Sequence, residues 1–573
     1  MAHTRTPEVL ITGAGPVGLS AAAELGRHGV SCRLIDRLPA RLPYAKAIGI
    51  QPRTLEIWDR MGLARTVLEA AVPLLGQLVY VNGRQVARLE MELPPEVPYG
   101  FAALPQYETE RLIEEYVAAL GTVIERGTEL LSFTQDEHGV TARLRTASGA
   151  EEEVRTGYLV GCDGAHSTVR KGLGLTFEGG AFQEEFMLAD VVADWDLPHE
   201  YSVRSTHFAA DGSTDDALIC VPLPGEGRYR MSMMVPPELS AEAAPTSGPG
   251  SGDGAARGDG AARGDGVAHG IAEGDGRVPE LSHVQAVVDR LAPRPATVST
   301  MRWSSVFRIS HRIVDRYGEG RVFVAGDAAH IHPPTGAQGM NTGIQDACNL
   351  AWKLALVLKG AAGPALLAGY DAERRPVGEE VVGRTLRHST QGIESDPDDP
   401  RTVILREAQL LISYRGGPLA GAPSGPADAP QPGDRAPDCA GLTLPLAAYP
   451  LRLLDVLRDR TAHVVLLYGA DPAALAAAAE ATRSADRPPT GLGLGLHTIG
   501  VLALEAPEGA CETVANTAAV PGYRDAAGEF ARLYRPDGPT GFLVRPDGYL
   551  GARFPLTGTA AALSDYLRAL SAS

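Results

Sequence analysis

The sequence predicts an α/β protein that combines a dinucleotide-binding domain, a domain with a mostly antiparallel sheet, and a C-terminal α/β domain. Three stretches predict the first domain, because each is an apolar strand followed by a glycine-containing turn and a helix. They begin at Val9, Tyr158 and Val322. Short β-like runs between them predict the antiparallel sheet. A segment rich in Pro, Gly and Ala, ending near residue 437, separates the last domain.

The first stretch carries a glycine motif typical of dinucleotide binding. Val9–Thr12 is a predicted strand and Leu19–His28 a predicted helix. Three glycines lie between them: Gly13, Gly15 and Gly18. Such glycines allow a tight turn and the close approach of a pyrophosphate, which the helix N-terminus binds. Asp36 ends the next strand and is placed to accept hydrogen bonds from ribose hydroxyls, and Arg37 follows it, either to contact the adenosine half or to lie in solvent. The motif does not separate FAD from NAD.

The stretch beginning at Val322 is the longest of the three. Its apolar run ends at Gly326-Asp327, and the sequence Asn341–Leu358 has apolar residues at helical spacing. A loop rich in Gly and Pro, Pro333–Gly339, joins the two. Glycines let the backbone approach a ligand, and the helix N-terminus offers free N–H groups and the positive end of a dipole. This arrangement suits an anionic ligand, and Asp327 suits a ligand hydroxyl. Taken alone, the stretch fits an ordinary strand–turn–helix corner equally well.

The remaining patterns predict the other two domains. Residues 78–91 read as a hairpin with its turn at Asn82-Gly83, and later β-like runs extend the sheet that would form one wall of a pocket. Residues 241–277 contain almost no large apolar side chain and a tandem GDGAAR, so they are predicted to be a disordered loop. Residues 440–573 read as an α/β unit. Cys439, immediately before this unit, and Cys511 within it cannot form a CxxC pair, which argues against redox chemistry there.

Composition excludes several classes of function. The chain has 573 residues and a formal net charge of −18, which argues against binding to nucleic acid or to an anionic membrane. It has no run of 18 uncharged apolar residues, and its polar start leads directly into a strand, so neither a membrane span nor a signal peptide is expected. Six scattered cysteines show no metal-site spacing. We therefore expect a cytoplasmic protein with no metal site, as a monomer or a homodimer.

The motifs together resemble those of the FAD-dependent aromatic hydroxylases, the family of para-hydroxybenzoate hydroxylase, phenol hydroxylase and the enzymes that tailor aromatic polyketides. The stretch GDAAHIHPPTGAQGMN is the most specific part of this resemblance. It implies that Asp327 binds the ribityl chain of FAD and that the loop around Pro334 lines the oxygen-transfer site. It also implies that the loop ending at Gly339 lies beside the isoalloxazine ring, and that Met340 and Asn341, at the start of the helix, face the N1–C2=O edge of that ring.

The resemblance also assigns residues outside that stretch. Gln106, and with a weaker match Arg111, would contact the ribityl chain, and the backbone of Leu130 would hold the adenine. Lys46 stands where the family has an arginine that touches the pyrophosphate and the flavin, although Lys cannot make the bidentate contact of Arg. The sequence GCDGAHS resembles another motif of the family, which implies that Asp163 lies near the pyrophosphate and that His166 contacts a nicotinamide nucleotide. A purely structural role for His166 remains the alternative.

The implied reaction is hydroxylation of an aromatic substrate. NADPH or NADH, bound transiently, would reduce FAD; molecular oxygen would then form a flavin C4a-hydroperoxide, which transfers one oxygen atom to an electron-rich ring. A polycyclic polyketide-type substrate follows from the resemblance to the polyketide branch alone. No residue is identified as a catalytic base. A Baeyer–Villiger monooxygenase on the same scaffold and a non-catalytic flavoprotein that binds a polyketide intermediate remain alternatives.

The expected domain organisation is discontinuous. Residues 1–75, 101–180 and 282–395 would form a Rossmann-like FAD-binding domain. Residues 76–100 and 181–281 would form the substrate-binding sheet domain. Residues 396–439 would be a linker, and the resemblance to phenol hydroxylase implies a thioredoxin-like fold for residues 440–573.

Overall fold

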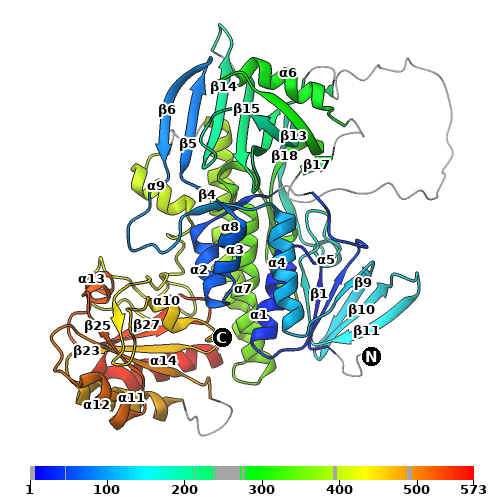
Figure 1. Ribbon diagram of the computed structural model, residues 1–573. Coiled ribbons are helices and arrows are strands. Elements are labelled where there is room, and N and C mark those ends of the chain that lie inside the picture. The colour runs from blue at the N-terminus through cyan, green and yellow to red at the C-terminus, as the bar shows by residue number, and fades with distance from the viewer. Residues whose placement is uncertain are drawn as a thin grey trace.

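The computed structural model describes residues 7–44, 47–212, 214–236, 239–240, 271–273, 278–391, 396–486 and 493–572. Figure 1 shows an antiparallel sheet at the top, a parallel sheet with its helices below it, and a C-terminal α/β unit at the lower left. Across the described residues, no helix combines the length and the apolar character that crossing a bilayer requires.

A six-stranded, mostly parallel sheet forms the centre of the molecule, in the order β19-β20-β12-β1-β2-β8. Its strands are β1 (Val9–Thr12), β2 (Cys32–Asp36), β8 (Ile124–Arg126), β12 (Tyr158–Gly161), β19 (Gly318–Glu319) and β20 (Val322–Val324). Helices α1 (Pro16–Arg27), α4 (Gln106–Ala119), α5 (Thr168–Gly172), α7 (Gly339–Leu358) and α8 (Ala368–Gln391) belong to the same unit. The largest apolar core lies between this sheet and its helices. This is the expected Rossmann-like arrangement.

Two small sheets and two helices complete this part of the chain. One sheet consists of β9 (Glu129–Asp136), β10 (Gly139–Arg145) and β11 (Glu151–Thr156). The other, which we call the bridging sheet, has the order β3-β7-β4 and consists of β3 (Gly49–Ile50), β7 (Phe101–Ala103) and β4 (Val72–Leu74). Between β3 and β4 the chain forms α2 (Pro52–Arg60) and α3 (Ala64–Ala70).

The second large sheet is mostly antiparallel, as expected, with the order β17-β18-β13-β16-β15-β14-β5-β6 and a further strand on β18. Its strands are β5 (Gly76–Val81), β6 (Arg84–Glu90), β13 (Phe177–Asp194), β14 (Tyr201–Phe208), β15 (Thr214–Pro222), β16 (Arg228–Met234), β17 (Ile271–Glu273), β18 (Thr297–Val314) and β21 (His330–Ile331). Helix α6 (Leu281–Leu291) covers one face through an apolar core.

The predicted disordered loop 241–277 needs one correction. Residues 271–273 form strand β17, which pairs with β18 through Ile271 and Ile309. Three residues are too few to show a strand period in sequence, so the pairing with β18 decides their structure. Residues 241–270 and 274–277 lie outside the described part of the chain.

The C-terminal unit has a six-stranded mixed sheet in the order β22-β25-β24-β23-β26-β27. Its strands are β22 (Leu442–Thr443), β23 (Val464–Gly469), β24 (His497–Leu502), β25 (Gly522–Asp525), β26 (Thr540–Val544) and β27 (Leu550–Pro555). Its helices are α10 (Leu453–Leu457), α11 (Pro472–Ala485), α12 (Ala510–Ala518), α13 (Glu529–Tyr534) and α14 (Thr559–Ala572). Separate apolar cores cover the two faces of the sheet, which agrees with the expected thioredoxin-like α/β fold.

A buried network of charges fastens this unit to α7 and α8. The guanidinium of Arg545 donates to both carboxylate oxygens of Glu373, at 2.7 and 2.8 Å, and Lys353 donates to the same carboxylate at 2.8 Å. Asp547 accepts hydrogen bonds from Arg545 and from the indole of Trp352. Burial opposes ionisation of Glu373, but Arg545 and Lys353 outweigh it and lower the pKa of this carboxyl group. The C-terminal unit is therefore docked on the helix that begins at the candidate site.

The same interface contains a histidine that makes stability depend on pH. His463 is fully buried, its Nε2 lies 3.0 Å from the hydroxyl of Tyr566, and its ring meets Trp352 edge-on. Burial, with Arg545 adding to the effect, lowers the pKa of His463 to about 3. Below pH ~6.5, the ordinary pKa of histidine, His463 binds a proton in the unfolded chain but stays neutral in the folded chain.

We expect this proton to destabilise the folded protein in acid. Between pH 7 and pH 5, His463 should contribute a loss of about 2 kcal/mol in the free energy of unfolding. His463→Gln removes this contribution, so the stability of the wild type relative to the variant should fall by that amount over the same range. Urea unfolding of both proteins at the two pH values measures it. A difference that does not change with pH would show that His463 is not held neutral.

Candidate FAD site

The three predicted motifs meet at one edge of the parallel sheet. Strands β1, β2, β12 and β20 run parallel, so their carboxyl ends lie side by side. A Cβ built on Gly13 would come within 2.2 Å of the carbonyl oxygen of Cys162, beside Asp163. A Cβ on Gly326 would come within 2.8 Å of Val17, in the first turn of α1. This edge is the position at which open α/β sheets bind nucleotides.

The glycines of the first motif have different surroundings. Gly13 has a φ of +95° and, like Gly18, has no room for a side chain, because a Cβ on Gly18 would lie 1.8 Å from the carbonyl oxygen of Gly13. Gly15, in contrast, faces nearly open space, and so does Gly164 in the second motif. Gly13 and Gly18 therefore set the turn and the helix packing, while Gly15 and Gly164 border an open cradle.

Two aspartates flank this cradle. Asp36 accepts hydrogen bonds from the backbone N–H groups of Ala14, at 2.7 Å, and Leu38, at 2.8 Å, so it holds the glycine loop as well as facing a possible ribose. Oδ2 of Asp163 accepts from the backbone of Thr168 at 2.7 Å, at the start of α5. Oδ1 of Asp163 is buried and has no hydrogen-bond partner among the described residues. A ligand hydroxyl would satisfy that oxygen, and burial raises the pKa of this carboxyl group.

The turn that carries Asp327 is held from behind by a carboxylate of α7. Asp346 is fully buried and accepts from the backbone N–H of Gly326 at 3.2 Å, from Nε2 of His330 at 2.8 Å, and from Arg374 at 2.7 Å. Burial raises the pKa of Asp346, but Arg374 and His330 outweigh it and lower the pKa overall. Asp346 and Arg374 were not predicted, because nothing in the sequence indicates a contact between them.

The loop Pro333–Gly339 is clamped against β3. The side chain of Asn341 donates to the carbonyl oxygens of Gly49, at 2.9 Å, and Ala337, at 2.8 Å, and it accepts from the backbone N–H of Gln51. The side chain of Gln51 in turn donates to the carbonyl oxygen of Gly336 at 2.6 Å. The amide of Asn341 is thus committed to the protein, which leaves the backbone N–H groups at the start of α7 to meet a ligand. Pro334 is exposed and Met340 is buried.

A second set of contacts reaches the loop from the segment expected to be a linker. That segment contains helix α9 (Pro400–Glu407). Glu407 accepts from Nε2 of Gln338 at 3.0 Å, lies against Gly336, and pairs with Arg384 of α8. Gln409 donates to Oε1 of Gln338 at 2.8 Å. Composition alone predicted a linker over residues 396–439, whereas Glu407 and Gln409 of this segment pack against the loop Pro333–Gly339.

The remaining predicted site residues differ in their exposure and in their distance from the cradle. Gln106 begins α4, donates to Glu110 at 2.8 Å, and accepts from the backbone of Ala47, so it lies beside the cradle. Arg111 is paired with Glu108 and Glu115 on the surface of α4. Arg37 and His166 are exposed, and the side chain of Leu130 is buried, which leaves its backbone for any contact. Lys46 lies outside the described residues.

Comparison with known proteins identifies the family. The sequence model of the FAD binding domain family matches residues 6–248 and 272–385. The chain belongs to the FAD-dependent aromatic hydroxylases. It is 39% identical over 382 residues to 6-methylpretetramide 4-monooxygenase of Streptomyces rimosus, covering 66% of this chain and 61% of that protein. It is 30% identical to pentachlorophenol 4-monooxygenase of Sphingobium chlorophenolicum, covering 95% of this chain and 93% of that protein.

A solved structure shows the same likeness over nearly the whole chain. The anhydrotetracycline hydroxylase of Streptomyces rimosus superposes with a TM-score of 0.69 at 27% sequence identity and covers 99% of each chain. The FAD binding domain match means that the present chain uses FAD, with NAD(P)H as reductant and molecular oxygen as the second substrate of a monooxygenase. The cradle fits FAD, because its open glycine edges suit a pyrophosphate and the buried Oδ1 of Asp163 lacks the donor that a sugar hydroxyl supplies.

The antiparallel sheet turns a polar and aromatic face toward the FAD-binding part. One row of side chains crosses four strands on this face and consists of Trp303, Asp190, Arg230 and Val221. Asp190 and Arg230 form a buried ion pair. Tyr44, from the loop after β2, stacks on Trp303 with ring centroids 5.0 Å apart. Val221 packs on a cluster with Ile48, Val72 and Ala103 of the bridging-sheet region. The two parts of this hydroxylase therefore meet across this face.

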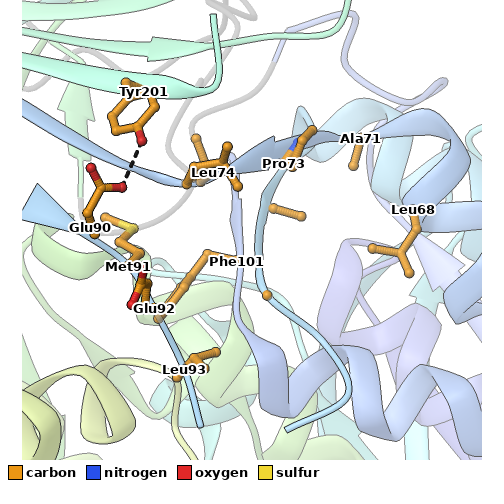
Figure 2. Close-up of a pocket in the computed structure, with 13 residues that line it drawn as sticks. Leu68, Ala71, Pro73, Leu74, Glu90, Met91, Glu92, Leu93, Phe101 and Tyr201 are labelled. Atoms are coloured by element: carbon orange, nitrogen blue, oxygen red, sulfur yellow. Dashed lines mark hydrogen bonds between the residues drawn. The ribbon is translucent and has the colours of Figure 1, made fainter. Parts of the chain in front are cut away.

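A separate apolar cavity of about 730 Å³ lies at the edge of the same junction. Figure 2 shows Leu68, Leu74, Met91, Leu93 and Phe101 around it, with the hydroxyl of Tyr201 donating to Glu90 on one side. Its Phe101 and Leu74 belong to β7 and β4, whereas β3 of the bridging sheet lies against the loop at Ala337. Within the bridging sheet, β3 is therefore the strand at the loop, and β7 and β4 are the strands at the cavity.

Proposed function

We propose that this chain hydroxylates a polycyclic aromatic compound of the polyketide type, with one atom of molecular oxygen and NAD(P)H as reductant. The observation that carries the proposal is the meeting of three motifs at one sheet edge, facing an aromatic sheet surface, in a chain related to 6-methylpretetramide 4-monooxygenase. We further propose the discontinuous domain division expected from the sequence, except that α6 (Leu281–Leu291) and β18 (Thr297–Val314) belong with the antiparallel sheet and not with the FAD-binding domain. Association as a monomer or a homodimer stays a prediction.

Each part of the site has a defined task in this proposal. Bound FAD supplies the redox and oxygen chemistry. Gly15 and Gly164 admit its pyrophosphate, Asp163 and Asp327 accept from its hydroxyls, and the first N–H groups of α7 face its negatively polarised edge. Pro334 lines the space in which oxygen is transferred. Asp346 and Asn341 fix the turn and the loop from behind, which keeps these groups in place without reorganisation.

The substrate is placed on the sheet face rather than in the cavity of Figure 2. The parallel stack of Tyr44 on Trp303 supports this position, because a planar ring already lies against the sheet there. The buried Arg230 lies beneath Trp303, with its guanidinium carbon 5.2 Å from the ring centroid. The volume of the cavity favours a second candidate position for the substrate, so an experiment must separate the two.

A substrate screen tests the proposed activity. The FAD-loaded protein is mixed with NADPH or NADH and a panel of simple phenols and polycyclic aromatic compounds. We expect polycyclic compounds to accelerate nicotinamide oxidation more than simple phenols, and to yield products with one added ring hydroxyl. An inserted ester oxygen would instead show Baeyer–Villiger chemistry. No acceleration by any compound that binds the protein would contradict the proposal.

Substitution at the two candidate positions locates the substrate. Trp303→Leu removes a stacking surface worth roughly 1 kcal/mol, so we expect KM for an accepted substrate to rise about fivefold, with FAD binding unchanged. Leu74→Trp, which fills part of the cavity, should leave KM unchanged. Steady-state kinetics of both variants measure this. The opposite pattern, with KM altered only by Leu74→Trp, would place the substrate in the cavity.

A further inference from the structure

His332 presents a buried acceptor nitrogen to the start of α7. The residue is 9% exposed, and its Nδ1 lies 2.9 Å from the carbonyl oxygen of Pro333, an acceptor that fixes the proton on Nδ1. Nε2 therefore carries a lone pair, and this atom is buried with no hydrogen-bond partner among the described residues. A Cβ on Gly339, the first residue of α7, would lie 3.1 Å from it. A buried polar atom of this kind calls for an explanation.

The surroundings keep His332 neutral while no negative charge is present at the helix start. Burial, with the neighbouring His330 next in importance, lowers the pKa of His332 to about 4. The charged and titratable groups that face it are Asp327 of the turn, His330 of β21 and Arg384 of α8, and Arg384 is in turn paired with Glu407. His330 is hydrogen-bonded to Asp346, so His332 is the member of this stacked histidine pair whose Nε2 is open to a proton.

We infer that His332 takes up a proton from solvent when the bound FAD is reduced. The inference rests on the proposed position of the isoalloxazine ring at the start of α7. A hydride that passes from NAD(P)H to FAD carries two electrons and no further proton, so the reduced ring acquires one negative charge. The positive end of α7 favours that charge. A new anion beside Nε2 favours the protonated imidazole, which then bears a compensating positive charge.

The step balances with groups already named. The hydride leaves the nicotinamide and joins FAD, a solvent proton binds Nε2 of His332, and the nicotinamide becomes cationic. When the flavin is oxidised again, the anion disappears and His332 returns its proton. His332 is a positioning residue in this scheme, because it tunes the charge at the flavin and does not touch the aromatic substrate.

The pH dependence of the midpoint potential tests the inference without turnover. Each proton bound together with two electrons contributes about 30 mV per pH unit. We expect the FAD-loaded wild type to show about 59 mV per pH unit above pH ~5, where one proton accompanies the hydride and a second binds His332. His332→Asn keeps a donor for the carbonyl oxygen of Pro333 but cannot take up the proton, so it should show about 30 mV per pH unit. His138→Asn, at an exposed turn, is the matched control and should behave as the wild type.

A second measurement needs no variant. Anaerobic reduction of the wild type by one equivalent of NADPH in weakly buffered dye solution should consume about one proton per FAD, and the near-ultraviolet spectrum should be that of the anionic reduced flavin. Zero protons consumed, a neutral reduced flavin, or a slope that His332→Asn leaves at the wild-type value would each overturn the inference. Such results would leave the proposed hydroxylation intact, because substrate-stimulated NADPH oxidation is measured independently.

Discussion

Arg545→Met is expected to lower the free energy of unfolding by roughly 3–5 kcal/mol, the usual consequence of removing one partner from a buried ion-pair network. Arg545 and Glu373 are both fully buried, and Arg545 is the only arginine that the structure shows donating to both Glu373 and Asp547. Without it, two carboxylates remain buried close together, with Lys353 as the nearest cation. The substitution should also disturb the FAD site, because Lys353 and Trp352 belong to α7, whose first residues border that site.

Chemical unfolding followed by tryptophan fluorescence measures this effect. Arg568→Met is the matched control, because Arg568 is an exposed residue of α14 whose ion pair, among the described residues, is with the neighbouring surface residue Asp565. Such a surface pair contributes little, so the control should stay within about 0.5 kcal/mol of the wild type. Equal stabilities of the two variants would show that the C-terminal unit is not held by this network.

Asp327→Ala is expected to leave a folded protein that binds FAD roughly ten- to a hundredfold more weakly. The carboxylate follows Gly326 at the end of β20, where a charge-assisted hydrogen bond to a ribityl hydroxyl is worth on the order of 1.5–3 kcal/mol. The turn itself is held by Asp346, which accepts from the backbone of Gly326, so removal of Asp327 should not unfold it. The variant should purify partly colourless and regain activity when FAD is added.

Titration of apoprotein with FAD, together with far-ultraviolet circular dichroism, distinguishes a binding role from a folding role. Asp136→Ala, at the exposed end of β9, serves as the control for loss of a carboxylate. If Asp327→Ala binds FAD with wild-type affinity, the flavin does not bind against this loop. A large loss of helical signal would show that Asp327 supports the turn instead.

The glycine motifs were predictable because their physical requirements are local. A strand, a turn with φ above zero and a helix N-terminus all follow from residues close together in sequence, as at Gly13 and Gly326. The sheet order then brings the three strand ends together, and this step needed only the expectation of a parallel sheet. The resemblance to a known family extended the prediction to Asp163 and Gln106, which also lie at this edge.

Long-range contacts account for what the sequence did not reveal. Asp346 acts through Arg374 and His330, the side chain of Asn341 is committed to Gly49 and Gln51, and none of these pairs has a local signature. Glu407 was assigned to a linker because the segment is rich in Pro and Gly in its second half. Its helix begins earlier, at Pro400, and reaches the loop only in the folded chain. Contacts of this kind depend on packing and not on composition.

The FAD content of the purified protein tests the central claim, that the three motifs build one cofactor site. The protein is denatured, and the supernatant is analysed for released flavin against the protein concentration. We expect one noncovalent FAD per chain, or, for protein purified without it, restoration of one FAD per chain on titration of the apoprotein. A supernatant without FAD, from a folded protein that also fails to bind added FAD, would contradict the account.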